Sequence, residues 1–348
     1  MKVDAILLAG FGGPEGQDDV IPFLRNVTRG RGVPDERLEA VAHHYRARGG
    51  VSPINGQNRA LKAALEAELA RRGLDLPVYW GNRNWAPYFT DALTEARAAG
   101  HRRLLALVTS AYTSYSGVGQ YLEDFAGALD ETHLAGELEI AKLREFFDHP
   151  GFVAPFVDGV AAALARVARE RPGAPTHVLF VTHSVPTAAA LASGPEHGPG
   201  GAYVAQHRAV AEVVMRQSAP EGTPWSLVYQ SRSGSPSVPW LEPDVNDALD
   251  ELAGRGVGAV VVVPIGFVSD HMEVVWDLDT EATTTAERHG MLAVRVPTPG
   301  VHPAFVAGLV DLVVERLGDV PDERRPHLTP LGPWPDLPPV GSVAGVVR

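Results

Sequence analysis

The chain has 348 residues, 45% of them hydrophobic, and a formal net charge of −12 at pH 7. This length exceeds that of one ordinary hydrophobic core, so we expect two domains. The negative charge, with no run of five Lys and Arg residues, argues against a nucleic-acid partner. Because the sequence contains no cysteine, it excludes disulfides, thiolate ligands and a cysteine-ligated iron–sulfur cluster, which leaves His, Asp and Glu to bind any metal.

The sequence shows no sign of a membrane segment or an export signal. No apolar run approaches the roughly 20 residues that cross a bilayer. The N-terminal MKVDAILLAG enters a strand pattern directly, without a cleavage-site signature. We therefore expect a soluble, cytoplasmic protein with no integral membrane segment.

In the first half of the chain, short apolar runs alternate with longer amphipathic stretches, which is typical of a parallel sheet covered by helices. The predicted strands cover residues 3–9, 78–81, 104–108 and 138–141. The predicted helices cover residues 54–72, 87–99 and 117–130. This half is assigned to residues 1–149.

The second half repeats the pattern. Its predicted strands cover 177–182, 225–229, 259–264 and 292–296, and its predicted helices cover 151–170, 202–217, 243–254 and 271–288. The sequence thus predicts an α/β protein with two domains, each with a mostly parallel four-stranded sheet flanked by helices. The second domain is assigned to 150–300, followed by a terminal helix at 301–318 and a Pro-rich tail at 319–348.

Several segments interrupt this alternation. The opening LLAGFGGPEG has Glu15 at the third glycine position of a dinucleotide-binding G-x-G-x-x-G motif, so it predicts a tight turn near a ligand and no dinucleotide site. Segments 193–201 and 231–239 are rich in Gly, Pro and Ser, and we expect each to follow a strand and form a loop at a carboxyl edge. Seven prolines in the 28 residues from Pro321 onward predict an extended or disordered tail.

A histidine stands at the end of a predicted buried strand, in the stretch VLFVTHSVP. The ordinary explanation is that His183 is hydrogen-bonded to a neighbouring carbonyl group. The alternative is a neutral imidazole that faces a cleft, where it can accept a proton or bind a metal near pH 7.

Acidic residues gather after another predicted strand, in SDHMEVVWDLDTEA. They have an ordinary explanation, in which Asp270 caps a helix and Glu273 completes a capping box. Yet Glu273, Asp277 and Glu281 recur at i, i+4 and i+8 and predict one carboxylate stripe, with Arg288 as the closest base at helical spacing. The stripe is either a solvated face or a path of oxygen ligands for Mg²⁺ or hydrated Fe²⁺.

Positive charge and hydroxyl groups gather near the glycines of YRARGGVSP. Surface arginines are common, but a local positive charge in an acidic chain also fits an anionic ligand. The residues in question are Arg29, Arg31, Arg46 and Arg48, together with Ser52 and, after strand 104–108, Ser116 and Tyr121.

Taken together, these segments resemble the ferrochelatase family up to about residue 318. The matching stretches are RGRGVP, YRARGGVSPINGQ, VTHSVP, WLEPD and GFVSDHMEVVWDLDTEA. The last carries H-x-E-V-x-x-D-x-D after a strand and is the most distinctive. The resemblance implies two Rossmann-like, chelatase-type domains with a porphyrin in the cleft between them.

The resemblance also implies roles for individual residues. His183 and Glu273 would face each other across the cleft as the catalytic pair, and Asp277 and Glu281 would extend an acidic line as further metal contacts. Near the porphyrin carboxylates it places Arg29, Arg31, Ser52, Ser116 and Tyr121. The chain departs from the family at Phe11, where many bacterial members have a tyrosine that can approach iron, and at Thr182, where we expected a smaller residue.

We therefore expect a lyase that inserts Fe²⁺ into a porphyrin, with His183 as the main proton acceptor and metal contact and Glu273 assisting it. Iron is then a substrate, and no tightly bound cofactor is expected. One alternative is a cobalt or nickel tetrapyrrole chelatase, for which His271 is the one close additional histidine. Another is a tetrapyrrole-binding carrier or sensor without turnover.

The favoured porphyrin is coproporphyrin III, which would give coproheme in heme biosynthesis, with protoporphyrin IX as the alternative. The sequence offers no apolar lip for the poorly soluble protoporphyrin. Four propionates need cationic or hydroxyl partners, and charge-assisted hydrogen bonds supply them. The candidates are Arg29, Arg31, Arg46, Ser52, Ser116 and Tyr121, with Phe11 at the porphyrin face. Heme-pathway enzymes on either side of this step are the expected partners.

Overall fold

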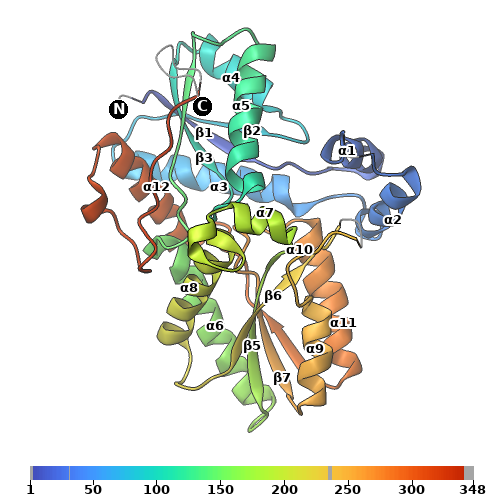
Figure 1. The fold of residues 1–348 in the computed structure, drawn as a ribbon. Coiled ribbons are helices and arrows are strands. Elements are labelled where there is room, and N and C mark those ends of the chain that lie inside the picture. Colours follow the sequence, from blue (N-terminus) through green and yellow to red (C-terminus); the bar gives the residue numbers. More distant parts are fainter. Residues whose placement is uncertain (1–2, 31, 234–236, 341–348) are drawn as a thin grey trace.

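The computed structural model describes residues 3–30, 32–233 and 237–340. Within these residues the chain forms two four-stranded parallel sheets, each covered by helices on both faces (Figure 1). The predicted α/β fold class is confirmed. The strand order is β2-β1-β3-β4 in the first sheet and β6-β5-β7-β8 in the second, so the two sheets have the same topology.

The first sheet consists of β1 (Ala5–Gly10), β2 (Val78–Asn82), β3 (Arg103–Val108) and β4 (Glu139–Lys142). Alternate side chains of β1 face opposite layers: Ile6 and Leu8 pack towards α3 (Pro53–Arg71), while Ala5 and Leu7 pack towards α4 (Phe89–Ala98) and α5 (Gln120–Glu131). Because both faces are covered, every residue of β1 is buried, and its sequence is continuously apolar.

The second sheet consists of β5 (Thr176–His183), β6 (Trp225–Gln230), β7 (Ala259–Val263) and β8 (Leu292–Arg295). Helices α6 (Pro150–Glu170) and α8 (Gly201–Ser218) cover one face, and α9 (Val245–Gly254) and α11 (Thr283–Arg288) cover the other. All eight strands predicted from the sequence are present, with ends that differ by a few residues.

Three short helices were missed. Helices α1 (Val20–Val27) and α2 (Asp35–Arg46) project from the first half towards α10 (Met272–Trp276) (Figure 1), and α7 (Thr187–Ala192) follows β5. The expectation that segment 193–201 directly follows a strand is therefore wrong, since α7 lies between them. The remaining short turns are η1 (Gln17–Asp19), η3 (Pro195–His197) and η5 (Asp322–Arg324).

Two predicted α-helices contain π-helical turns. The predicted helix 271–288 is α10, then the π-helix η4 (Asp277–Ala282), then α11. The predicted helix 117–130 begins with the π-helix η2 (Tyr115–Gly119) ahead of α5. Because a π-helix has i→i+5 hydrogen bonds, side chains within η4 do not follow the α-helical spacing on which the carboxylate stripe was predicted.

One hydrophobic layer joins the two halves. It contains side chains from β1 and β5 together with α3, α6, α8 and α12 (Pro303–Leu317). Helix α12 follows the second sheet but packs against α3 of the first half and against α6 (Figure 1). A side chain on Gly151 of α6 would lie 2.7 Å from the Cα atom of Gly308 on α12, so the absence of side chains there permits this close approach.

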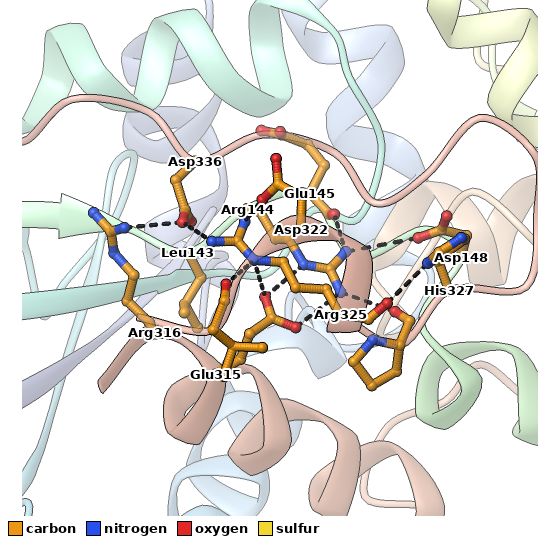
Figure 2. Close-up of polar contacts among 12 residues, drawn as sticks. Leu143, Arg144, Glu145, Asp148, Glu315, Arg316, Asp322, Arg325, His327 and Asp336 are labelled. Carbon is orange, nitrogen blue, oxygen red and sulfur yellow. Dashed lines mark hydrogen bonds and ion pairs between the residues drawn. The ribbon is translucent and has the colours of Figure 1, made fainter. Parts of the chain in front are cut away.

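Residues 319–340 form an irregular segment of turns, with the short helix η5, that packs against the first half. Val340 pairs with Ile140 beside β4 in an antiparallel bridge. Figure 2 shows how charged side chains hold the segment: Arg144, just after β4, donates to Glu315 and to the Pro326 carbonyl oxygen. Residues 341–348 lie outside the described part of the chain.

Helix α6 corrects the expectation that no stretch is long and apolar enough to span a membrane. Among the described residues it is the one helix that meets this test by length and composition. Its side chains Phe152, Phe156 and Val160 are fully or almost fully buried, and it packs between α8 and α12. One face of the helix therefore packs on the core and the opposite face is exposed.

Candidate active site

The two sheets place two of the predicted site residues at equivalent positions. In each sheet the order reverses beside the first strand, β1 or β5, and ligands of open α/β sheets bind at the carboxyl end of such a switch point. Phe11 directly follows β1, and His183 is the last residue of β5. The predicted position of His183 at a strand end is confirmed.

His183 is oriented by two contacts. Its Nδ1 atom lies 2.5 Å from the Ser184 carbonyl oxygen. Since a carbonyl oxygen only accepts, Nδ1 carries a proton, so that whenever the ring is neutral Nε2 is the acceptor or metal-binding atom. Nε2 lies 3.5 Å from Oε2 of Glu273, with the His183 side chain 33% exposed and that of Glu273 46% exposed. The two explanations given for His183 therefore both apply: Nδ1 is hydrogen-bonded to a neighbouring carbonyl group, and Nε2 faces Glu273.

Glu273 is in the first turn of α10, but it does not close a capping box. The residue before this helix is His271, and no side chain caps it. The Asp270 carboxylate instead accepts two hydrogen bonds from Arg295 at 3.0 and 3.1 Å and one from Thr298 at 3.2 Å. The capping explanation for Asp270 and Glu273 is wrong, and the Glu273 carboxylate is free to face His183.

The His183–Glu273 pair favours its charged form. Burial opposes charge on both groups, but the hydrogen bond and the attraction between them prevail. As a result the pKa of Glu273 is lowered from 4.5 to about 2, and the pKa of His183 is raised above 6.5. Perturbed pairs of this kind in a cleft are typical of functional sites.

The two other predicted metal contacts lie differently. Burial, together with the nearby charges of Glu273 and Glu281, raises the pKa of Asp277 from 3.8 to about 7, although a hydrogen bond from Ser231 acts in the opposite direction. Glu281 is exposed and accepts a hydrogen bond from the indole of Trp276 at 2.8 Å. Among the described residues no group of three His, Asp or Glu side chains is arranged to hold a metal ion, so the predicted four-residue metal set does not converge on one point.

The bases near this row also differ from the prediction. Arg288 pairs with Asp250 at 2.9 Å and does not offset the stripe. Two histidines face the site instead. His271 Nδ1 lies 3.9 Å from Glu273 Oε2, and His44 of α2 stacks on Trp276 at 4.3 Å between ring centroids. Sequence reasoning missed His44, because the helix that carries it was not predicted.

A cavity of about 300 Å³ lies between the two halves. Its lining comes from both: Arg48, Val51 and Pro53 precede or begin α3, and Met272 and Val275 belong to α10. Arg48 also crosses between the halves and donates to Thr280 at 3.1 Å. Four of the five lining side chains are apolar, as is common in ligand pockets, and Arg48 supplies the one charge.

The predicted substrate residues of the N-terminal half divide by exposure. Phe11 is 37% exposed and packs edge-on against Phe23. Arg29 is exposed and donates to Asn26 at 2.8 Å, and Arg46 is exposed and paired with Glu39 at 2.5 Å. Arg31 lies outside the described residues.

The three predicted hydroxyl residues are not equally accessible. Ser116 is exposed within η2, whereas Ser52 and Tyr121 are each only 4% exposed. Sequence reasoning missed Arg83, which donates to the Ser116 carbonyl oxygen at 3.1 Å, lies over the Tyr121 ring at 4.4 Å and pairs with Asp124. Arg83 holds this segment in place, a role that residue spacing alone does not reveal.

Curated relatives share most of this sequence. The chain is 63% identical to a protein named coproporphyrin III ferrochelatase from Leifsonia xyli subsp. xyli, over 96% of this chain and 89% of that protein. Proteins of the same name from Streptomyces coelicolor and Tropheryma whipplei are 58% and 54% identical, over 97% of this chain and 92% and 87% of their own lengths.

Solved structures support the fold. The match to SirB from Bacillus subtilis with Fe³⁺ has a TM-score of 0.51 at 12% identity and covers 90% of this chain and 95% of that one. The sirohydrochlorin chelatase SirB from B. subtilis subspecies spizizenii in complex with cobalt gives 0.52 at 12%, over 92% and 97%. At this identity the likeness concerns the fold alone, and it agrees with the expected pair of chelatase-type domains.

The family assignment rests on a wider match. The family model described as Ferrochelatase matches residues 3–317, which includes both sheets, the cleft between them and α12. With this match and the identity to curated relatives, the chain belongs to the ferrochelatase family.

Proposed function

We propose that this protein inserts Fe²⁺ into coproporphyrin III and releases two protons, giving coproheme in heme biosynthesis. The single observation that supports the chemistry best is His183 Nε2 facing Glu273 at 3.5 Å at the carboxyl end of β5. The substrate assignment draws on the names of relatives that are 54–63% identical over nearly the whole chain.

Metal insertion requires two pyrrole protons to leave the macrocycle. Nε2 of neutral His183 accepts a proton, and the Glu273 carboxylate stabilises the imidazolium that forms. The Ser184 carbonyl oxygen keeps Nδ1 protonated, so that Nε2 is the atom presented to the substrate. Burial lowers the pKa of His271, so this neighbour of Glu273 is neutral and serves in this proposal as the second proton acceptor.

Asp277 and Glu281 extend the carboxylates from Glu273 along η4, and in this proposal they attract Fe²⁺ before insertion. Oxygen ligands suit hydrated Fe²⁺. With a pKa of about 7, Asp277 is partly protonated at neutral pH and exchanges a proton readily when a cation approaches. Fe²⁺ is a substrate here, and the expectation that no cofactor is tightly bound stays a prediction, as do the cytoplasmic location and a transfer of product to heme-pathway enzymes.

The four propionates of coproporphyrin III need donors at the rim of the cleft. Arg29 and Arg46 are exposed, and their present partners are half-buried Asn26 and exposed Glu39. Exposed pairs of this kind contribute little to stability, so exchange for a propionate costs little. Ser116 offers an exposed hydroxyl. Ser52 and Tyr121 are buried and would need to move to bind a propionate.

The test compares kcat/KM for coproporphyrin III and for detergent-dispersed protoporphyrin IX, with Fe²⁺, Co²⁺ and Ni²⁺ side by side. Coproporphyrin III has two propionates more than protoporphyrin IX, and each can make a charge-assisted hydrogen bond. After the free energy of these bonds is reduced for solvent screening, we expect kcat/KM to be about tenfold or more higher for coproporphyrin III. Equal or higher values for protoporphyrin IX would overturn the substrate assignment. A strong preference for Co²⁺ or Ni²⁺ would overturn iron as the metal.

A further inference from the structure

A buried polar cluster lies directly beneath His183 and has no part in the chemistry described above. It comprises Thr182 of β5 and Tyr203 and His207 of α8, with 1%, 6% and 0% of each residue exposed. Tyr203 and His207 are four residues apart and therefore lie on the same face of α8. Buried polar groups that depend on one another in this way fix a single geometry.

Four contacts connect the cluster. The Tyr203 hydroxyl donates to the His183 carbonyl oxygen at 2.8 Å and also lies 2.8 Å from Thr182 Oγ1. Thr182 Oγ1 in turn lies 2.9 Å from His207 Nε2, and His207 Nδ1 lies 2.7 Å from the Tyr203 carbonyl oxygen.

The available protons set the direction of these contacts. Burial lowers the pKa of His207 to about 3, so its ring is neutral. Its single proton is on Nδ1, because the Tyr203 carbonyl oxygen only accepts, and Nε2 then accepts from the Thr182 hydroxyl. The Tyr203 hydroxyl is then the remaining donor for two acceptors at 2.8 Å, Thr182 Oγ1 and the His183 carbonyl oxygen, and its single proton is shared between them.

The hydrogen bond from Tyr203 to the His183 carbonyl oxygen affects the position of the imidazole through the backbone. The carbonyl group of His183 belongs to the peptide plane that joins it to Ser184, and Ser184 supplies the carbonyl oxygen that binds His183 Nδ1. The Ser184 carbonyl group belongs to the next peptide plane, which shares the Ser184 Cα atom, so a displacement of the His183–Ser184 peptide would shift the Ser184 oxygen relative to the ring. The N–H of this peptide donates to the Gln230 carbonyl oxygen at 2.8 Å, and Tyr203 supplies the second hydrogen bond that fixes it beside His183.

The same cluster touches the segment that leads to Glu273. The backbone passes so close to Thr182 at Gly266 that a Cβ atom there would lie 2.1 Å from Thr182 Oγ1. The cluster is also fixed to the opposite half of the molecule, because Tyr112 stacks on His207 at 3.6 Å between ring centroids and Gln206 bonds to Thr113.

We propose that Tyr203 is a positioning residue for metal insertion: its hydroxyl fixes the His183–Ser184 peptide, and through it the orientation of the His183 ring. The inference rests on the proposed function and deepens it. When a hydrogen-bond partner that orients a metal-binding histidine is mutated, activity typically falls 10- to 100-fold.

The experiment compares Tyr203→Phe with Tyr112→Phe. Both variants remove one buried phenol hydroxyl beside His207, but the Tyr112 hydroxyl has no hydrogen-bond partner among the described residues. At saturating coproporphyrin III, kcat is expected to fall about tenfold in Tyr203→Phe and to stay within about twofold in Tyr112→Phe. The Kd for coproporphyrin III, measured by fluorescence quenching without metal, is expected to stay within about twofold in both.

The proposal is overturned if Tyr203→Phe keeps its kcat, if the two variants lose kcat equally, or if the porphyrin Kd weakens in proportion to kcat. Failure of Tyr203→Phe to fold while Tyr112→Phe folds would make the hydroxyl a structural group and would also overturn it. Wild-type protein in the same assay separates the two questions, because absence of metal insertion there would refute the proposed function itself.

Discussion

Two clusters of charged side chains differ in how completely their charges are matched. In the one around Arg144, the guanidinium group makes two hydrogen bonds to Glu315, at 2.8 and 3.2 Å, and the side chains are 1% and 7% exposed (Figure 2). In the other, His183 and Glu273 meet through one 3.5 Å contact and remain 33% and 46% exposed.

The difference separates structure from chemistry. A buried charge is stable only when it is paired, and the charged side chains around Arg144 pair with one another and hold the tail against the first half. At the cleft, charges are incompletely paired and carry displaced pKa values, so protons and cations can still exchange. Changes in the first cluster should therefore alter stability, and changes in the second should alter turnover.

The largest effect is expected for His183→Ala. Loss of the proton acceptor should lower kcat by about 10²- to 10⁴-fold. Because the residue acts in the chemistry and contributes little to anchoring, the Kd for porphyrin should stay within about tenfold. Steady-state rates together with porphyrin titrations measure both. Equal loss of binding and turnover would show that His183 is structural.

Next comes Arg144→Met, which removes both hydrogen bonds from Arg144 and leaves buried Glu315 with only the longer 3.6 Å contact to Arg325. Breaking a buried ion pair in this way costs about 3–5 kcal/mol, so urea unfolding should show a loss of that size while kcat of the folded protein is retained. Arg166→Met is the matched control, since its pair with Glu170 is exposed on both sides and should contribute less than about 1 kcal/mol. A loss of turnover in folded Arg144→Met would erase the distinction between the clusters.

Glu273→Gln tests the coupling within the cleft pair. His183 must be neutral to accept a proton, so kcat/KM should rise with pH through its pKa. Burial alone would lower that pKa, but the Glu273 carboxylate raises it above 6.5. Removing the charge should move the rising limb to lower pH, as well as reduce kcat. A pH profile with an unchanged limb would mean that the two side chains act independently.

The same pair predicts the sign of a pH effect on stability. The lowered pKa of Glu273 stabilises the fold above 4.5, and this contribution is lost as pH falls towards about 2. The raised pKa of His183 stabilises the fold below 6.5, and that contribution is lost as pH rises through the raised value. The stability difference between wild type and Glu273→Gln should therefore be largest between pH 4.5 and 6.5.

The smallest effect is expected for Asp277→Asn combined with Glu281→Gln. If these carboxylates attract the cation, the KM for Fe²⁺ should rise about fivefold while the KM for porphyrin stays unchanged. In wild type the KM for Fe²⁺ should also rise as pH falls below about 7, where Asp277 is protonated. Glu66→Gln combined with Glu170→Gln removes two exposed charges elsewhere and controls for net charge. Unchanged iron dependence would leave the row as solvated surface.

The sequence predicted the cleft better than it predicted the tail. Local periodicity marks a buried strand, and the polar residue that ends it, His183, stands out at once. The partner of Arg144 is 171 residues away, so no local pattern reveals the pair. The prolines of the tail predicted an extended or disordered segment and gave no sign of ion pairs such as Arg325–Asp336.

Other differences have equally local causes. Helix α2 was missed because its apolar face consists only of Leu38, Ala42 and Tyr45 in an otherwise polar stretch. The carboxylate stripe was predicted with α-helical spacing, but η4 is a π-helix, so Asp277 is half-buried while exposed Glu281 accepts a hydrogen bond from Trp276. The spacing of Asp270 fitted a capping box, but its carboxylate instead accepts a hydrogen bond from Arg295 of β8.

The central claim is tested most directly by anaerobic mixing of the protein with coproporphyrin III and Fe²⁺, followed by absorbance. The account predicts that the four visible bands of the free-base porphyrin collapse into a metalloporphyrin spectrum with wild-type protein and with folded Arg144→Met, and that they persist with His183→Ala. Persistence of the free-base bands with wild-type protein, despite tight porphyrin binding, would contradict the claim and identify a binding protein without turnover.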